Sequence, residues 1–311
     1  MEIIVTPSTV RVCVRCRPLS LKEGRGKKCV TLVKDRITVG DKTFAFDSVY
    51  GETITQEEVF NGSIAALVEG CFQGFNATVL AYGQTGSGKT HTMIGNALMG
   101  DRDEEGVIPR VVRYVFGTLA EKLRTTTGKL VPSLHVSFIE IYNDEVKDLL
   151  HPDILPRDIF IREDKMGKIF FTGAREEVVL NVENALEYLD RGNMTRTTAE
   201  TLMNAASSRS HAIFTLSIEL YEYCGAVESG ESGETQGGGS LITSKIHLVD
   251  LAGSERVKKT GADGMRLKES VGINQVSLLL IVIFRKHNAR NLKQNSCIYL
   301  KHANTGSAIS R

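Results

Sequence analysis

The chain has 311 residues, enough for one large domain or two small ones. Its hydrophobic content of 41% and charged content of 24% are ordinary for a globular protein. With 38 basic and 37 acidic residues the formal net charge is +1, so the overall charge attracts no polyanion and an acidic partner must be met by a local patch. We therefore expect no direct binding of nucleic acid.

The six cysteines are predicted to be reduced thiols. Cys13 and Cys16 form the only C-x-x-C pair, but residues 10–17 alternate like a strand, and residues three apart on a strand face opposite sides. No second pair completes a zinc site. Cysteines used in this way are typical of a cytoplasmic protein. Residues 1–9 lack the basic start and the long apolar core of a secretory signal.

Apolar periodicity and turn residues predict alternating strands and helices along the chain. Pro18 ends the first strand, the Gly40-Asp41 turn joins two short ones, and the capping box Thr55–Glu58 starts the first helix. The predicted strands are 11–17, short strands within 37–46, 77–82, 134–142, 213–220 and 242–251; the predicted helices are 56–68, 108–123, a short one up to 150, and 182–190; residues 225–240 are predicted to form a flexible loop.

The sequence GQTGSGKT at residues 83–90 fits the phosphate-binding loop pattern G-x-x-x-x-G-K-[ST] at every required position. Glycines let backbone N–H groups curl around phosphate oxygens, Lys89 reaches the outer phosphates, and Thr90 offers a hydroxyl to Mg²⁺. A buried strand before the loop and a helix after it form the arrangement that an anion needs. A purely structural glycine-rich turn is the alternative. The predicted phosphate site comprises Gly83, Gln84, Thr85, Gly86, Ser87, Gly88, Lys89 and Thr90.

A second segment, NAASSRSH at residues 204–211, holds three hydroxyls, a guanidinium and an imidazole within eight positions. Read alone, it fits a helix cap followed by a turn, because Ser and Asn favour such places. Beside a nucleotide site, a serine can supply a second hydroxyl to Mg²⁺, and Arg209 can form a charge-assisted pair.

A third segment, HLVDLAGSE at residues 247–255, places Asp250 at the end of an apolar strand and Gly253 three positions later. An Asp there can hold Mg²⁺ through water, and a Gly lets the backbone approach the terminal phosphate. A strand ending in an Asp turn is the alternative. The joint occurrence of the three segments favours a nucleotide site.

Taken in order, these segments resemble a kinesin motor domain. The resemblance rests on RCRP (15–18), GQTGSGKTHTM (83–93), SFIEIYNDEVKDLL (137–150), NAASSRSH (204–211) and IHLVDLAGSE (246–255), and covers roughly residues 9–274. The sequences IREDKMGKIFFTG and GCFQGFNATVLAYGQTG are most similar to those of the chromokinesin-like kinesin-4 group. The resemblance implies an α/β fold, a P-loop NTPase core of the kinesin type, with helices on both faces of a central mixed, mostly parallel β-sheet.

The resemblance also implies roles for single residues, with ATP and Mg²⁺ as the ligands. Arg15, Arg17, Pro18 and His91 flank the adenine, and residues 83–90 cradle the phosphates. Thr90 and Ser208 ligate Mg²⁺, and Asp250 holds it through water. Ser207 helps to place the attacking water and Gly253 senses the γ-phosphate. Arg209 and Glu255 pair when the two switch segments close, which helps to pass the water's proton onward. Because phosphoryl transfer is mostly positioning and charge stabilisation, loops that close around the ligand suffice.

The partner that the resemblance implies is the microtubule, whose surface is acidic. The candidate basic contacts are Lys165, Lys168, Lys258, Lys259, Arg266 and Lys268. At each of these positions a solvated surface side chain is the alternative. Their contribution is expected to weaken with salt. Because the chain has no heptad run, we expect a monomer, located in the cytoplasm on the microtubule cytoskeleton and not in a membrane.

The resemblance stops near Gln275. Residues 276–311 lack both the family's continuation of the helix that begins at Ile273 and its Y-R-D-S-K-L-T-R-L-L helix, a main microtubule contact. We therefore expect an incomplete motor domain at 1–275 and a divergent tail at 276–311, without the last core strand, the last core helix and the neck linker. Val-Ser is what a GTAAGT splice donor encodes, so we hypothesise that the tail is translated intron; a divergent but real C-terminus is the alternative.

Two functions fit this sequence. The first is a microtubule-stimulated ATP hydrolase, the head of a motor that moves along microtubules. The second is a truncated, non-motile product that binds nucleotide and tubulin. A GTPase switch is set aside because the dipeptide Asn-Lys, which begins the guanine-reading motif, occurs nowhere in the chain. No second substrate site for a small-molecule kinase is evident, and the apolar run 276–284 is about half as long as a bilayer requires.

Overall fold

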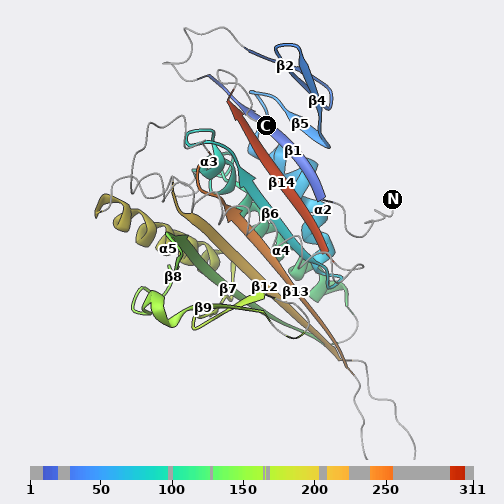
Figure 1. Cartoon of the computed structure of the whole chain (residues 1–311). Coiled ribbons are helices and arrows are strands. Elements are labelled where there is room, and N and C mark those ends of the chain that lie inside the picture. Colours follow the sequence, from blue (N-terminus) through green and yellow to red (C-terminus); the bar gives the residue numbers. More distant parts are fainter. Residues whose placement is uncertain are drawn as a thin grey trace, which may run out of the picture.

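A computed structural model describes residues 10–19, 29–96, 101–126, 129–163, 165, 169–202, 209–223, 239–254 and 295–304. Its centre is a nine-stranded mixed sheet in the order β11-β7-β12-β13-β6-β14-β1-β5, with β8 paired to β7 (Figure 1). The strands of this sheet are β1 (Val10–Arg17), β5 (Ser48–Tyr50), β6 (Asn76–Tyr82), β7 (Lys129–Tyr142), β8 (Glu145–Asp148), β11 (Glu177–Val178), β12 (His211–Tyr223), β13 (Gly239–Asp250) and β14 (Asn295–Asn304).

Two smaller sheets and a set of helices complete the described part. The small sheets join β2 (Val30–Val33), β3 (Arg36–Val39) and β4 (Lys42–Ala45), and β9 (Phe160–Glu163) with β10 (Ile169–Thr172). The α-helices are α1 (Gln56–Val59), α2 (Ala65–Cys71), α3 (Lys89–Met93), α4 (Val107–Thr125) and α5 (Val182–Leu202), with a π-helical turn η1 (Phe60–Ile64) and a 3₁₀ turn η3 (Pro156–Asp158). None of these helices is long and apolar enough to cross a membrane.

The parallel half of the sheet sets the position of the site. Strands β13, β6, β14, β1 and β5 all run in parallel with their neighbours in this half. The carboxyl ends of parallel strands meet at one edge, where ligands bind in open α/β sheets. The phosphate loop follows β6, Asp250 ends β13 and Arg17 ends β1. Three predicted parts of the nucleotide site therefore share one edge, and the predicted mixed sheet is confirmed.

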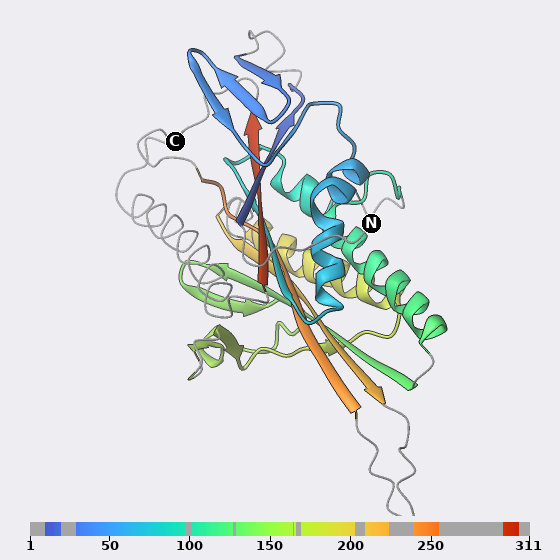
Figure 2. The ribbon, with the colours of Figure 1, turned by 90° about the vertical axis from the view of Figure 1, so that its right-hand side faces the viewer.

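Alternation along β6 divides the two faces of the sheet. Val79 and Ala81 belong to the main core, whereas Leu80, between them, packs with Ile159 and Phe171 on the other face. All five described α-helices contribute to the main core and gather on that side (Figure 2). Among the described residues no α-helix packs on the second face, and the expectation of helices there stays a prediction.

The cysteine pair in β1 follows the same alternation. Cys13 packs in the main core, and Cys16 packs with Val14 and Ile37 in a separate small cluster. The two thiols therefore face opposite sides of the strand, which confirms the reason for rejecting a zinc site at this pair.

The expectation that the last core strand is absent was wrong. Strand β14 lies between β1 and β6 and pairs with both in parallel (Figure 1). Ile298 and Leu300 are fully buried in the main core. Comparison with family motifs overlooked the short apolar run Cys297–Leu300, which is consistent with a buried strand. Without β14, β1 and β6 would each present an unpaired edge. The division of the chain at Gln275 and the intron hypothesis stay predictions.

The predicted short helix that ends at Leu150 was also wrong. Residues Glu145–Asp148 form β8, which pairs antiparallel with β7. The connection consists of Asn143 and Asp144, at φ 49° and 63°. Two successive positive φ values make a two-residue turn that matches the twist of paired strands, and Asn and Asp tolerate this conformation. The turn at Asn143 and Asp144 thus determines that this segment is a strand, although the spacing of its apolar residues had predicted a helix.

The other predicted helices and strands are present, and β2, β9, β10 and β11 were not predicted. The capping box is present, with Thr55 as N-cap and Glu58 as its reciprocal partner. Helix α5 and strand β12 are longer than predicted. Of the predicted loop at 225–240, Gly239 and Ser240 begin β13, and residues 225–238 lie outside the described residues.

The buried position of β14 predicts a large effect of truncating Ile298. Ile298→Ala should lower the free energy of unfolding by about 2–5 kcal/mol, because it removes buried methyl groups and leaves a cavity. Urea denaturation followed by circular dichroism measures the change. Leu241→Ala, at a side chain 60% exposed on β13, is the matched control and should change little. Equal stability of the two variants would contradict the central position of β14.

Candidate functional site

The phosphate loop is a tight turn between β6 and α3. Gly86 and Gly88 have φ values of 75° and 99°, which residues other than glycine rarely adopt. Lys89 is 8% exposed and folds back over the loop, where its Nζ donates to the carbonyl oxygens of Gly83 at 2.9 Å and Gln84 at 3.1 Å. The glycines thus allow a curled backbone, and the ammonium group lies against it.

Asp250 joins the third segment to the loop. The Thr90 hydroxyl donates to Asp250 Oδ2 at 2.6 Å, and this aspartate is 3% exposed. The parallel register of β13 and β6 sets Asp250 opposite Ala81. Past the strands, the N–H of Ser254 donates to the Gly83 carbonyl at 3.2 Å. The structure therefore brings two of the three predicted segments into direct contact.

Arg196 is a site residue that sequence reasoning missed. It lies on α5, is 5% exposed, and its Nη1 is 3.5 Å from Asp250 Oδ2. Its Nε is 3.6 Å from Glu140 Oε1 on β7, and its Nη2 donates to the carbonyl and hydroxyl oxygens of Ser210, both at 3.2 Å. A buried guanidinium needs such partners to offset its lost hydration. Because the partners lie on other elements, no local spacing points to this arginine.

His211 connects the second and third segments. Its Nδ1 accepts from the N–H of Ala252 at 3.1 Å, and the ring is 1% exposed. The acceptor role at Nδ1 places the proton of the neutral ring on Nε2. Gly253 follows as a buried residue, and Arg209 lies half-buried before Ser210. The other predicted residues Ser207, Ser208, Glu255, Lys168, Lys258, Lys259, Arg266 and Lys268 lie outside the described residues, so their roles stay predictions.

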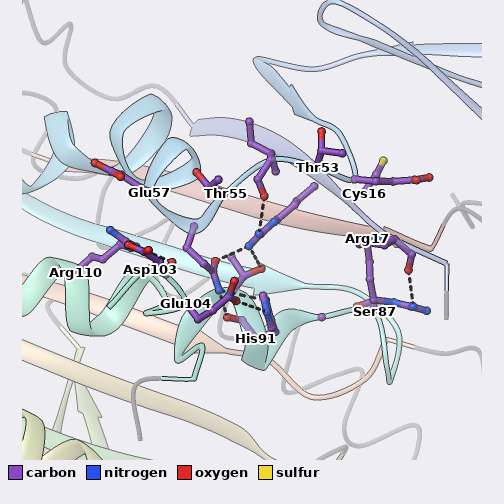
Figure 3. A pocket seen from close by; sticks show the side chains of 17 residues that line it. Cys16, Arg17, Thr53, Thr55, Glu57, Ser87, His91, Asp103, Glu104 and Arg110 are labelled. Atoms are coloured by element: carbon purple, nitrogen blue, oxygen red, sulfur yellow. Dashed lines mark hydrogen bonds and ion pairs between the residues drawn. The ribbon is translucent and has the colours of Figure 1, made fainter. Parts of the chain in front are cut away.

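A cleft of about 680 Å³ lies beside the loop and is lined by all four residues predicted to flank the base, Arg15, Arg17, Pro18 and His91 (Figure 3). Arg15 Nη1 donates to Gln56 Oε1 at 2.6 Å and to Thr92 Oγ1 at 2.9 Å. Burial lowers the pKa of the Arg15 guanidinium from its usual value, and the charge of Glu104 opposes this shift. Hydrogen bonds from Arg15 to Gln56 and Thr92 thus hold this part of the cleft wall together.

Two buried polar atoms test whether these residues fit a magnesium nucleotide. Ser87 Oγ and Asp250 Oδ1 have no hydrogen-bond partner among the described residues. Buried polar atoms ordinarily have one, so each needs an explanation. Ser87 lies in the phosphate loop two residues before Lys89, and Asp250 accepts from the Thr90 hydroxyl. Hydroxyl and carboxylate oxygens are the ligands that Mg²⁺ prefers, and the residues present therefore fit an anionic ligand with its metal ion.

Comparison with known proteins agrees with this geometry. The family model of the kinesin motor domain matches residues 10–299. The chain belongs to the kinesin family. The match passes Gln275 and enters β14.

Individual relatives support the predicted subgroup. This kinesin chain is 46% identical to the chromosome-associated kinesin KIF4A of Homo sapiens over an alignment of 279 residues, which covers 87% of this chain and 21% of that protein. It is 41% identical to the kinesin-like protein KIN-4A of Gossypium hirsutum over an alignment of 292 residues, which covers 87% of this chain and 28% of that protein. The likeness to the kinesin-4 group is confirmed. The chain spans about a fifth to a quarter of the length of these relatives.

A solved structure of a fast kinesin has the same fold. It matches with a TM-score of 0.77 and 30% sequence identity, over 96% of this chain and 86% of that chain. The predicted kinesin-type α/β core is therefore confirmed.

Removing Arg196 should destabilise this kinesin chain strongly. Arg196→Ala leaves the carboxylates of Asp250 and Glu140 buried without their cation, which costs about 3–5 kcal/mol. Equilibrium unfolding in urea measures the loss. Arg191→Ala, at an exposed arginine on the same helix, should cost far less. Similar losses of stability in the two variants would show that the ion pairs of Arg196 with Asp250 and Glu140 contribute nothing beyond the place of this residue in the helix.

The thiols of Cys16, Cys29 and Cys71 should differ in reactivity. Burial and the charge of Glu52 raise the pKa of Cys16 to about 11, and burial raises that of Cys71 to about 12. Since the thiolate is the nucleophile, both should resist iodoacetamide at pH 8, whereas the exposed Cys29 reacts. Peptide mass spectrometry of the native protein measures this, with the denatured protein as control. Labelling of Cys16 as fast as Cys29 would contradict the buried position.

Proposed function

We propose that this chain is the catalytic head of a microtubule motor, which binds Mg-ATP and hydrolyses it to drive movement along microtubules. The observation that carries this proposal is the contact of 2.6 Å between Thr90 and Asp250. A hydroxyl at the start of a helix and a carboxylate at the end of a neighbouring parallel strand are the pair that P-loop nucleotidases use around Mg²⁺.

The phosphate end of the site binds by charge and backbone donors. Lys89 would contact the outer phosphates, and Ser87 with its neighbours would offer N–H groups and a hydroxyl. Thr90, Ser208 and, through water, Asp250 would hold Mg²⁺, which when bound neutralises charge on the phosphates and orients them. Ser87 Oγ and Asp250 Oδ1 have no hydrogen-bond partner among the described residues, and the bound ligand would supply one to each, which supports this role.

Hydrolysis requires that water be placed and its proton removed. We assign these tasks to Ser207, Arg209, Gly253 and Glu255. The described part supports their proximity, because Arg196 contacts both Ser210 and Asp250, and His211 accepts from the N–H of Ala252. Segments held together in this way can order and relax as one element when the terminal phosphate is present or lost.

The base would occupy the cleft beside β1, between His91 and the Arg15–Pro18 segment. These residues supply an aromatic ring, a proline and two guanidinium groups, which suit the faces of a heteroaromatic base. The volume of about 680 Å³ is in the range of small-molecule sites.

The track contacts of the proposal are basic side chains. Lys165 is exposed in the connection between β9 and β10, on the face of the sheet opposite to α2 and α4. Lys168, Lys258, Lys259, Arg266 and Lys268 are the other proposed contacts. Their effect on microtubule affinity should fall with ionic strength. The motor would act in the cytoplasm on the microtubule cytoskeleton, with the head as a monomer.

A second candidate is a non-motile product that binds nucleotide and tubulin. The observation that favours it is the content of residues 276–311, which lack the family's Y-R-D-S-K-L-T-R-L-L helix. Under this alternative the nucleotide site works, but microtubules do not accelerate turnover.

Steady-state ATP hydrolysis with and without microtubules tests the proposal. The expected result is turnover that microtubules stimulate and that Lys89→Ala abolishes, because the loop loses its cation for the outer phosphates. Lys42→Ala, at an exposed lysine on β4, is the control and should keep wild-type turnover. Turnover without stimulation would favour the second candidate, and no turnover above Lys89→Ala would contradict the proposal.

A further inference from the structure

Gln56 lies in the wall of the cleft and belongs to none of the segments that carry the family resemblance. It is the first residue of α1, is 4% exposed, and lines the cleft beside Arg15 and His91. The capping box of Thr55 and Glu58 fixes the first turn of this helix, which determines where Gln56 points.

Two contacts fix the orientation of the Gln56 amide. A guanidinium has donors only, so the oxygen Oε1 must face Arg15 Nη1, which lies 2.6 Å away. The nitrogen Nε2 then faces the carbonyl oxygen of His91 at 2.7 Å, which accepts a hydrogen bond. Both ends of the amide agree, so oxygen and nitrogen are assigned without ambiguity.

The oriented amide in turn fixes the His91 ring. Gln56 Nε2 lies 3.2 Å from His91 Nδ1 and can only donate, so Nδ1 accepts and the proton of the neutral ring lies on Nε2. That nitrogen lies 3.4 Å from Glu104 Oε2, in the segment before α4 (Figure 3). One side chain therefore determines both the rotation and the tautomer of the ring that faces the cleft.

We propose that Gln56 is a positioning residue for the base of the nucleotide. Its oxygen holds Arg15 and its nitrogen holds His91, so the two groups that flank the base keep a fixed separation before the ligand arrives. Preorganised groups bind more tightly because less side-chain freedom is lost on binding. This inference rests on the proposed function, since it concerns the base end of the same site.

The test distinguishes an effect on binding of the base from an effect on binding of the phosphates. Dissociation constants of Mg-ATP and of magnesium tripolyphosphate, which has no base, are measured by calorimetry for the full chain, Gln56→Glu and Gln56→Met. Gln56→Glu keeps an acceptor for Arg15 but turns the donor toward His91 into a second acceptor. Gln56→Met keeps the size and loses both contacts. ATP affinity should fall about tenfold in each variant, while tripolyphosphate affinity stays within about twofold.

The controls distinguish positioning from folding. Gln73→Glu makes the same charge change at an exposed glutamine after α2 and should leave both affinities unchanged. Equal losses for ATP and tripolyphosphate in the Gln56 variants would overturn the proposal, because they would show a structural role. Unchanged ATP affinity would overturn it too. A wild-type chain that binds neither ligand would instead refute the proposed function, and the inference with it.

Discussion

The carboxylate of Asp250 is the group on which the arrangement of the site depends. It is almost fully buried, and one of its oxygens receives the Thr90 hydroxyl and faces the guanidinium of Arg196. A buried charge without partners is costly, so the three elements that supply these groups must meet. The phosphate loop, β13 and α5 are therefore tied together by electrostatics as well as by packing, at the point where the ligand would bind.

The sheet makes that meeting possible. Because β6 and β13 are parallel neighbours, their carboxyl ends lie at one edge, and β1 brings its own end to the same edge through β14. Strand β14 is thus more than an addition to the sheet: it separates the strand that leads to the phosphate loop from the strand that leads to the base cleft. The distance between the phosphate end and the base end of the site depends on it.

The two ends of the site are stabilised in different ways. At the phosphate end, Ser87 and Asp250 keep buried polar atoms without partners among the described residues, which suits groups that await a ligand. At the base end, Gln56 is already hydrogen-bonded both to Arg15 and to His91. A preformed cleft beside buried polar atoms without partners suits the proposed nucleotide, whose phosphates would bind at the loop and whose base would be selected in the cleft.

The sequence alone determined the local chemistry. The spacing of Gly83 to Thr90 predicts a phosphate loop, Thr55 and Glu58 predict the start of a helix, and alternation predicts β1 and its opposed cysteines, because each of these depends on neighbours in the chain. The tertiary structure decided what depends on distant partners. Arg196 is a site residue only because it contacts Asp250 and Glu140, which lie on other elements. The orientation of the Gln56 amide is set by Arg15. The position of β14 is set by β1 and β6, the two strands that pair with it.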